Sequence, residues 1–192
     1  ADHLIENNSF FIKHIKQNKI YLNNENIFIF GIKPNTPSSE YGYFITKKLS
    51  KNLNKVTKFI EKPSVSKAKS IIKKKGYWNS GMFLIRKDSI INNYKKYQPL
   101  IYKNCLESVI KSKRKKNIYI LNKKFYTKTN NKSFDYAILE KIKKINAIKL
   151  NIPWSDLGSW KEICKMYNMN KKKYIKQSNV HFRPWGKYTN LF

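Results

Sequence analysis

The sequence predicts an α/β domain in which helices flank a mixed β-sheet. Short apolar runs closed by Gly or Pro are typical of strands, and they alternate with segments whose apolar residues recur at helical spacing. The 192 residues suffice for one domain with its own core, and 41% apolar and 15% aromatic residues can fill that core. Strands that alternate with helices in this way pack as layers.

The first half of the chain supplies four predicted strands and two predicted helices. Pro63 ends the strand that closes with FIEK, because proline cannot donate to a strand ladder. Ser64 or Ser66 can cap the helix that follows, and Gly76 can end it. The predicted elements are a helix over 4–18, strands over 26–33, 41–46 and 53–62, a helix over 64–76 and a strand over 77–86 with an Asn-Ser-Gly break inside it.

The second half is mostly helical in its pattern. Pro99 separates two helices, and Ser133 can cap a third. The apolar run NAIKLNI predicts a strand that leads directly into PWSDLGSW. The predicted elements are helices over 88–97 and 99–113, a strand over 117–121, a helix over 133–144, a strand over 146–152 and a helix over 158–168.

The net charge of +30 raises the question of a nucleic-acid partner. Only three of the 41 basic residues are Arg, whereas phosphate and base recognition favour the bidentate Arg fork. The lysines are spread along the whole chain, with KSKRKK at 111–116 as the longest run. The other abundant residues share AT-rich codons with Lys. We therefore interpret the charge as a solvated, Lys-covered surface and do not expect nucleic acid as the partner.

Neither a membrane nor an oxidising compartment is expected. No run of 18 apolar residues occurs, and the first residues, ADHLIENNSF, do not resemble a secretory signal. Cys105 and Cys164 lie far apart and form no Cys-x-x-Cys pair, which is typical of buried thiols in a reducing cytoplasm. The sequence leaves the oligomeric state open.

Six short motifs follow one another along the chain: FGIKPNTPSSEYGYF, FIEKP, YWNSGMF, SFDYAILEK, WSDLGSW and HFRPWGKY. Their order and spacing resemble the mannose-1-phosphate guanylyltransferases, specifically the bacterial type in which this domain precedes a phosphomannose isomerase cupin domain. The resemblance covers nearly the whole chain. It implies a partial nucleotide-diphospho-sugar transferase domain, Rossmann-like, over 1–178, and the start of a truncated isomerase region over 179–192.

The resemblance also implies a reaction and a metal. Mannose-1-phosphate attacks the α-phosphorus of GTP, pyrophosphate leaves and GDP-mannose forms. Such transfer depends on positioning and charge neutralisation, and Mg²⁺ prefers hard carboxylate oxygens for that task. The resemblance assigns the catalytic and metal-binding roles to Asp2 in ADH and Asp156 in WSDLGSW. Taken alone, Asp156 could equally cap the helix that follows it.

Five residues are expected on the sugar side of the site. In the family, Glu61 accepts hydrogen bonds from sugar hydroxyls and Lys62 contacts the sugar phosphate. Asn79 offers a donor and an acceptor to a hydroxyl, Gly81 permits close backbone approach, and Gly42 lets the sugar lie against the backbone. The alternative for Glu61 and Lys62 is an exposed Glu-Lys pair before a turn proline. The alternative for Asn79 is an asparagine in a β-bulge.

Some features depart from the family or carry no expected site role. Family members open with a Gly-rich loop that cradles the nucleotide phosphates, and these 192 residues contain no such loop. Ser39-Glu40 stands where Thr-Gly is usual, which adds negative charge near a phosphosugar. Asp135 is expected to have a structural or supporting role.

The alternative functions are a non-catalytic remnant, a basic nucleic-acid-binding protein, or a nucleotidyltransferase for another sugar or base.

Overall fold

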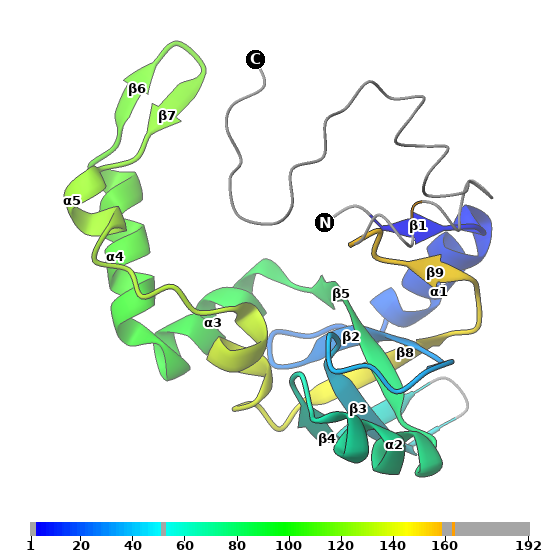
Figure 1. Ribbon diagram of the computed structural model, residues 1–192. Helices are drawn as coiled ribbons and strands as arrows, with labels where there is room; N and C mark the ends of the chain where they lie inside the picture. The colour runs from blue at the N-terminus through cyan, green and yellow to red at the C-terminus, as the bar shows by residue number, and fades with distance from the viewer. Residues whose placement is uncertain (1–2, 51–52, 159–162, 164–192) are drawn as a thin grey trace, which may run out of the picture. The chain divides into compact units, whose positions relative to one another are not determined.

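The computed structural model describes residues 3–50, 53–158 and 163 of a chain that divides into two compact units (Figure 1). One unit contains Ala1–Glu6 and Pro153–Phe192, and the other contains Asn7–Ile152. Asp2, Cys164 and the predicted isomerase region over 179–192 lie outside the described residues, as does nearly all of the predicted helix over 158–168.

The larger unit is built on five strands that close into a barrel in the order β2-β5-β3-β4-β8. Among these strands, β2 and β8 run parallel and the other pairs run antiparallel, so the predicted mixed sheet is confirmed. Short pairing of β4 with β8, at Asn54 and Lys55, closes the barrel. The strands are β2 (Ile27–Ile32), β3 (Tyr43–Lys48), β4 (Asn54–Ile60), β5 (Tyr77–Ile85) and β8 (Ile145–Leu150).

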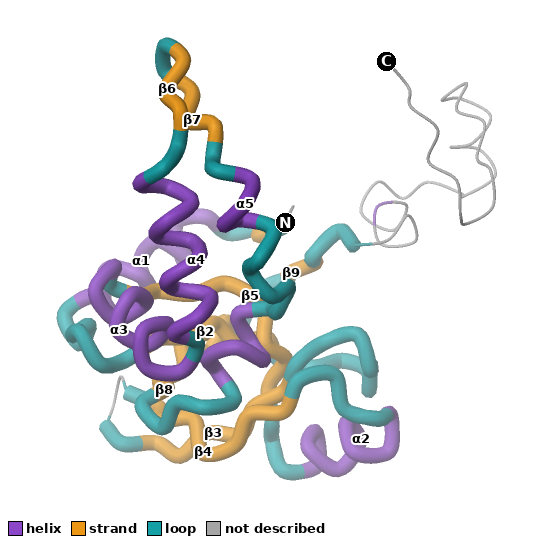
Figure 2. Tube along the Cα trace, turned by 90° about the vertical axis from the view of Figure 1, so that its left-hand side faces the viewer, coloured by secondary structure: helices purple, strands orange, loops and turns teal. Residues whose placement is uncertain are grey.

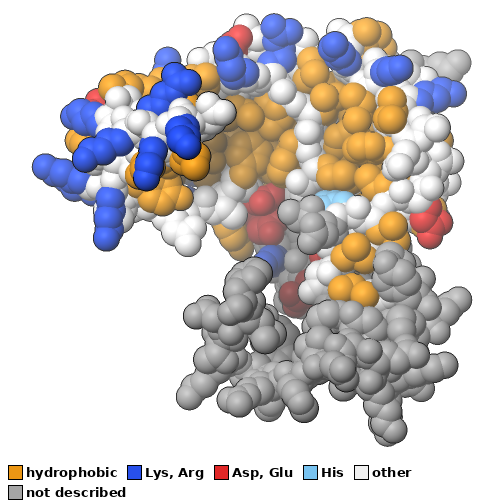
Figure 3. Space-filling model, turned by 90° about the horizontal axis from the view of Figure 1, so that it is seen from above, with side chains coloured by type: hydrophobic (Ala, Val, Ile, Leu, Met, Phe, Trp, Pro, Cys, Tyr) orange, Lys and Arg blue, Asp and Glu red, His pale blue; other side chains and the backbone are white. Residues whose placement is uncertain are grey.

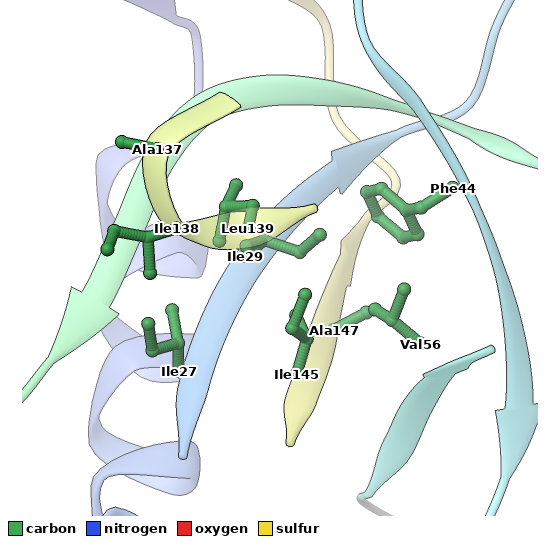
Figure 4. Packing of buried hydrophobic residues seen from close by; sticks show 9 residues of the cluster. All are labelled: Ile27, Ile29, Phe44, Val56, Ala137, Ile138, Leu139, Ile145 and Ala147. Carbon is green, nitrogen blue, oxygen red and sulfur yellow. The ribbon is translucent and has the colours of Figure 1, made fainter. Parts of the chain in front are cut away.

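The core lies around β2, whose six residues are all buried. A strand paired on both edges and covered on both faces reads as a continuous apolar run, as IFIFGI does. Helix α1 (Asn8–Lys19) packs Phe11 against Phe30 with ring centroids 5.2 Å apart. Figure 4 shows Ile29 of β2 beside Ala147 of β8 and Leu139 of the turn η1 (Asp135–Leu139). The core therefore fixes where η1 lies.

Helix α2 (Val65–Lys73) follows the turn after β4 and has the ends that the sequence predicts. The hydroxyl of Ser64 accepts a hydrogen bond from the Lys67 amide at 3.4 Å, so Ser64 is the cap. Gly76 donates its amide to the Ile71 carbonyl at 3.0 Å, and a side chain at Gly76 would overlap Ile71. The chain can then enter β5 immediately.

An arm extends from the barrel between β5 and η1, as Figures 1 and 2 show from two directions. Its hairpin is exposed along both strands, and Figure 3 shows Lys and Arg side chains gathered over the arm. The basic run 111–116 thus lies on a solvated surface. The predicted helix over 99–113 is too long, because residues 113–115 pair with 118–120. The arm consists of α3 (Lys87–Tyr97), α4 (Pro99–Ile110), β6 (Lys113–Lys115), β7 (Ile118–Ile120) and α5 (Lys123–Tyr126).

Two further predicted helices are wrong in extent. Leu4 and Ile5 form the strand β1 (Leu4–Ile5), which pairs with β9 (Trp154–Ser155), so the first helix starts only after the cap Asn7. The predicted helix over 133–144 contracts to η1, a single π-helical stretch, because the chain must reach β8 by Ile145. Among the described helices, none is long and apolar enough to cross a bilayer.

Candidate functional site

A cavity of about 620 Å³ lies beside the turn that follows β4. One wall is this turn and the other is the segment from 131 to 141, which contains η1. Carboxylates and ammonium groups are therefore mixed in one concave space, which suits a ligand with both hydroxyls and a phosphate. The charged residues of its lining are Glu61, Lys62, Lys132, Asp135, Glu140 and Lys141.

Glu61 is placed by the end of β4 and by an unusual backbone turn. Lys62, the next residue, has a left-handed φ of 43°, and the buried Pro63 then leads the chain away toward α2. Left-handed backbone in a non-glycine residue is uncommon and is found more often at functional sites. The turn leaves Lys62 exposed and Glu61 half-buried at the cavity wall.

The Glu61 carboxylate fits against Gly42, which precedes β3. A Cβ atom at residue 42 would overlap Oε2 of Glu61, so only glycine leaves the carboxylate its place. This oxygen is buried and has no hydrogen-bond partner among the described residues. A buried acceptor without a donor is costly, and a ligand hydroxyl could satisfy it. Gly42 therefore accommodates Glu61, and the expected contact of its backbone with the sugar stays a prediction.

The Glu61 carboxyl changes its protonation state near neutral pH. Burial raises the pKa of Glu61 to about 7, and the negative charge of Asp135 raises this pKa further, while Lys62 opposes the shift and Glu140 adds to it. Asp135 is affected in the same way: burial raises its pKa, against the lowering effects of its own backbone amide, Asn79 and Lys62. Two carboxyl groups of one cavity thus both resist ionisation.

Asn79 links Gly42 to Asp135 through hydrogen bonds. Its backbone amide donates to the Gly42 carbonyl at 2.7 Å, and its side-chain Nδ2 donates to Oδ1 of Asp135 at 2.9 Å. The Gly81 amide donates to its Oδ1 at 3.3 Å. Since Asn79 is buried and both ends of its amide are engaged, the geometry supports the bulge asparagine that the sequence left as the alternative. Direct contact with a sugar hydroxyl stays a prediction.

Gly81 serves the backbone of the bulge. The pairing of β2 with β5 shifts between Ile29 and Gly31, which places the extra residues of the bulge between Asn79 and Phe83, overlapping the Asn-Ser-Gly break that the sequence indicates. Gly81 has φ of 75°, and a Cβ atom there would meet nothing within 4 Å. The backbone conformation by itself calls for glycine here, and the predicted close approach of the sugar stays a prediction. The departure at Glu40 has little bearing on the cavity, because Glu40 is exposed and lies outside its lining.

Asp156 belongs to the smaller unit. Leu4 pairs with Ser155, so the strand register brings the stretch that follows Asp2 in sequence next to the stretch that carries Asp156. His3 accepts a hydrogen bond from the Trp154 indole at 3.1 Å, and its ring meets that indole edge-on. Asp156 is half-buried, and its Oδ1 accepts the Gly158 amide at 3.2 Å.

Sequence reasoning missed how closely Asp135 is linked to the cavity. Its motif and its place at the start of a helical stretch were visible, but the contact with Asn79 spans 56 residues. No local pattern encodes such a pairing. The metal assignment stays a prediction, because Asp2 is not described and the described residues contain no group of three His, Cys, Asp or Glu side chains around one point.

Curated relatives are similar to nearly the whole chain. It is 31% identical over 182 residues to the mannose-1-phosphate guanylyltransferase RfbM of Salmonella typhimurium, which covers 94% of this chain and 38% of that protein. It is 30% identical over 167 residues to the alginate biosynthesis protein AlgA of Pseudomonas syringae, with 85% and 35% covered. The chain thus spans less than two-fifths of these relatives.

Solved structures share the fold. A structure described as mannose-6-phosphate isomerase from Helicobacter pylori matches with a TM-score of 0.72 and 30% identity, over 81% of this chain and 61% of that one. One described as mannose-1-phosphate geranyltransferase from Thermus thermophilus has a TM-score of 0.75 at 20% identity, over 88% and 48%. The family model described as nucleotidyl transferase matches residues 1–173. The predicted resemblance is confirmed, and the chain belongs to the nucleotidyl transferase family.

Proposed function

We propose that this chain forms the sugar-phosphate side of a mannose-1-phosphate guanylyltransferase, which converts GTP and mannose-1-phosphate to GDP-mannose and pyrophosphate. The names of the relatives at about 30% identity support this assignment. Because the chain spans less than two-fifths of the first of them, the complete reaction is part of the proposal.

The observation that carries the proposal is the Glu61 carboxylate at the wall of a lysine-bearing cavity. Its buried Oε2 has no donor among the described residues, and Lys62, Lys132 and Lys141 line the same space. A sugar phosphate supplies what this arrangement lacks, since its hydroxyls donate hydrogen bonds and its phosphate carries negative charge. The combination fits a phosphorylated sugar better than a neutral sugar or a bare anion.

In the proposed reaction the residues of the cavity bind and orient. Glu61 accepts a hydrogen bond from a sugar hydroxyl, and Lys62 neutralises the 1-phosphate as a compact point charge. An oxygen of that phosphate then forms a bond to the α-phosphorus of GTP as the bond to pyrophosphate breaks. Such transfer needs in-line positioning more than a protein nucleophile.

Mg²⁺ is part of this proposal, with Asp2 and Asp156 as the residues that hold it. Magnesium commonly binds through one or two carboxylates together with waters and substrate phosphates, so two aspartates are an adequate protein contribution. The pairing of Leu4 with Ser155 brings the two relevant stretches of sequence together. When bound, the ion neutralises charge on the reacting phosphates.

The partners in this proposal are GTP and mannose-1-phosphate, and the expected compartment is the cytoplasm. Cys105 is exposed and not buried as the sequence predicted, but it is a free thiol, which fits a reducing environment. Another sugar or another base remains the competing assignment within the enzyme class.

Calorimetric titration with mannose-1-phosphate tests the sugar side without requiring turnover. We expect Lys62→Ala to weaken binding about tenfold or more, because a hydrogen bond to a charged group contributes about 1.5–3 kcal/mol. The matched control is Lys69→Ala, which removes an exposed lysine of α2 and should bind as the unaltered chain does. Equal losses in both variants, or tighter binding of glucose-1-phosphate, would reject the assignment to mannose-1-phosphate.

A further inference from the structure

We propose that Asp135 is a positioning residue for this sugar-phosphate site: it holds Asn79 in place and sets a second negative charge beside Glu61. The inference rests on the proposed function, because it concerns the same cavity. It makes specific the structural or supporting role that the sequence predicts, because Asp135 would act on ligand binding through Asn79 and through its charge.

The contacts form one continuous path from Asp135 to Glu61. Asp135 accepts the side-chain amide of Asn79 at 2.9 Å, and the backbone amide of Asn79 donates to the Gly42 carbonyl at 2.7 Å. Gly42 in turn lies directly against Oε2 of Glu61. A displacement of Asn79 therefore changes the surface on which the Glu61 carboxylate rests.

Asp135 is itself held by the core. It is the first residue of η1, and the next three residues of that turn after Tyr136 are buried to 1% exposure or less. The side chain of Gln98 donates to the Ala137 carbonyl at 2.9 Å and fixes the turn from the junction of α3 and α4. A π-helical stretch with buried anchors is a common setting for a functional side chain.

Charge gives Asp135 its second effect. Glu61 faces Lys62 within its own turn and Asp135 and Glu140 across the cavity, and Lys132 and Lys141 line the same space. Of the two acids, Asp135 raises the pKa of Glu61 more than Glu140 does. After burial, the charge on Asp135 is therefore the next contribution to the pH at which Glu61 becomes a full acceptor.

Ligand binding should therefore depend on pH through Asp135. A hydroxyl donates best to an ionised Glu61, so affinity for mannose-1-phosphate should rise with pH around the pKa of about 7. Asp135→Asn keeps an oxygen that can accept from Asn79 but removes the charge. Asp135→Ala removes both, which separates the hydrogen bond from the charge.

The test combines a titration of Glu61 with a binding profile. In the chain without ligand, the carboxyl carbon of Glu61 is followed by NMR from pH 4 to pH 9. We expect the midpoint to fall clearly in Asp135→Asn and to move much less in Glu140→Gln, which removes an exposed acid from the same cavity. An unchanged midpoint in Asp135→Asn overturns the proposal.

Calorimetry with mannose-1-phosphate at pH 6 and pH 8 then tests the effect on binding. At pH 8 Asp135→Asn should bind within about threefold of the unaltered chain, while Asp135→Ala should bind about tenfold more weakly, because only the latter frees Asn79. Equal affinity of Asp135→Ala and the unaltered chain at both pH values overturns the positioning role. If the unaltered chain fails to bind at either pH, the proposed function falls, and the ligand-free titration still decides the coupling.

Discussion

Glu61 and Asp156 both follow a strand and both lie in a motif of the family, but they are held in different ways. Segments of the larger unit that are distant in sequence act on Glu61: Gly42 lies against its carboxylate and Asp135 raises its pKa, while Asn79 is hydrogen-bonded to both Gly42 and Asp135. Asp156 accepts the Gly158 amide, two residues away, and this side chain has further interactions besides.

The difference shows how a role can be inferred in each case. Enclosure by distant segments gives Glu61 a shifted pKa and a buried oxygen, so its physical chemistry already points to a ligand. The inference of a role for Asp156 depends on strand register, because the pairing of β1 with β9 places this residue near the stretch after Asp2. Substitutions should therefore affect chemistry at Asp156 and both binding and stability around Glu61.

The largest expected effect is that of Asp156→Asn on turnover. Loss of the carboxylate that we propose as a metal ligand removes several kcal/mol of charge stabilisation, so we expect about a thousandfold drop in the rate of GDP-mannose formation by the native polypeptide that contains these residues. The free energy of unfolding should change little. Glu6→Gln is the control, because Glu6 is an exposed acid of the same unit. A variant with more than a tenth of the activity would contradict the metal assignment.

Gly42→Ala should have the second-largest effect, because the substitution acts on Glu61 by direct steric overlap. The added methyl would overlap Oε2, so the carboxylate must leave its position. We expect affinity for mannose-1-phosphate to fall by about ten- to a hundredfold, the equivalent of one or two lost hydrogen bonds. Calorimetry measures this loss. Unchanged affinity would mean that ligand binding does not require the Glu61 carboxylate at this position.

Gly81→Ala sharpens the contrast, because it alters conformation and leaves the space around Glu61 unchanged. Left-handed backbone costs a residue with a side chain about 1–2 kcal/mol, so the free energy of unfolding should fall by that amount. Affinity should stay within about threefold of the unaltered chain, since nothing within 4 Å would meet the methyl. Chemical denaturation and calorimetry on one preparation compare the two glycines. A larger binding defect at Gly81 than at Gly42 would reverse our interpretation.

The sequence predicted the barrel strands well because each one depends on local features. The run over 27–32 and the break at Asn79 to Gly81 are visible in the chain itself. The start of α1 and the length of η1 were predicted wrongly, since Leu4 has its partner at Ser155 and the chain has to reach β8.

The candidate site, too, could be predicted only where it depends on local sequence. Glu61 and Lys62 could be proposed from a short motif, but the fit of Gly42 against Glu61 and the link from Asn79 to Asp135 depend on tertiary contacts between distant residues. Propensity and periodicity contain no information on such contacts.

The last expected effect is similar in size to that of Gly81→Ala; it concerns stability and pH, and it tests the enclosure of Glu61 directly. A carboxyl whose folded pKa is raised favours the folded state when it is protonated, and that contribution is lost as the pH rises through about 7. Glu61→Gln removes the ionisation. After allowance for solvent screening of a half-exposed group, the variant should be more stable than the unaltered chain at pH 8 by about 1–2 kcal/mol.

This gain should shrink as the pH falls from 8 to 5, because the unaltered Glu61 then becomes protonated as well. Thermal unfolding across this range measures it, and a gain of this size corresponds to a rise of about 2–8 °C in the melting temperature. Glu25→Gln is the opposite control: Lys144 lowers the pKa of Glu25 through a hydrogen bond, so the variant should gain nothing at pH 8. If both variants behaved alike, the cavity would not be what shifts Glu61, and the comparison with Asp156 would lose its physical basis.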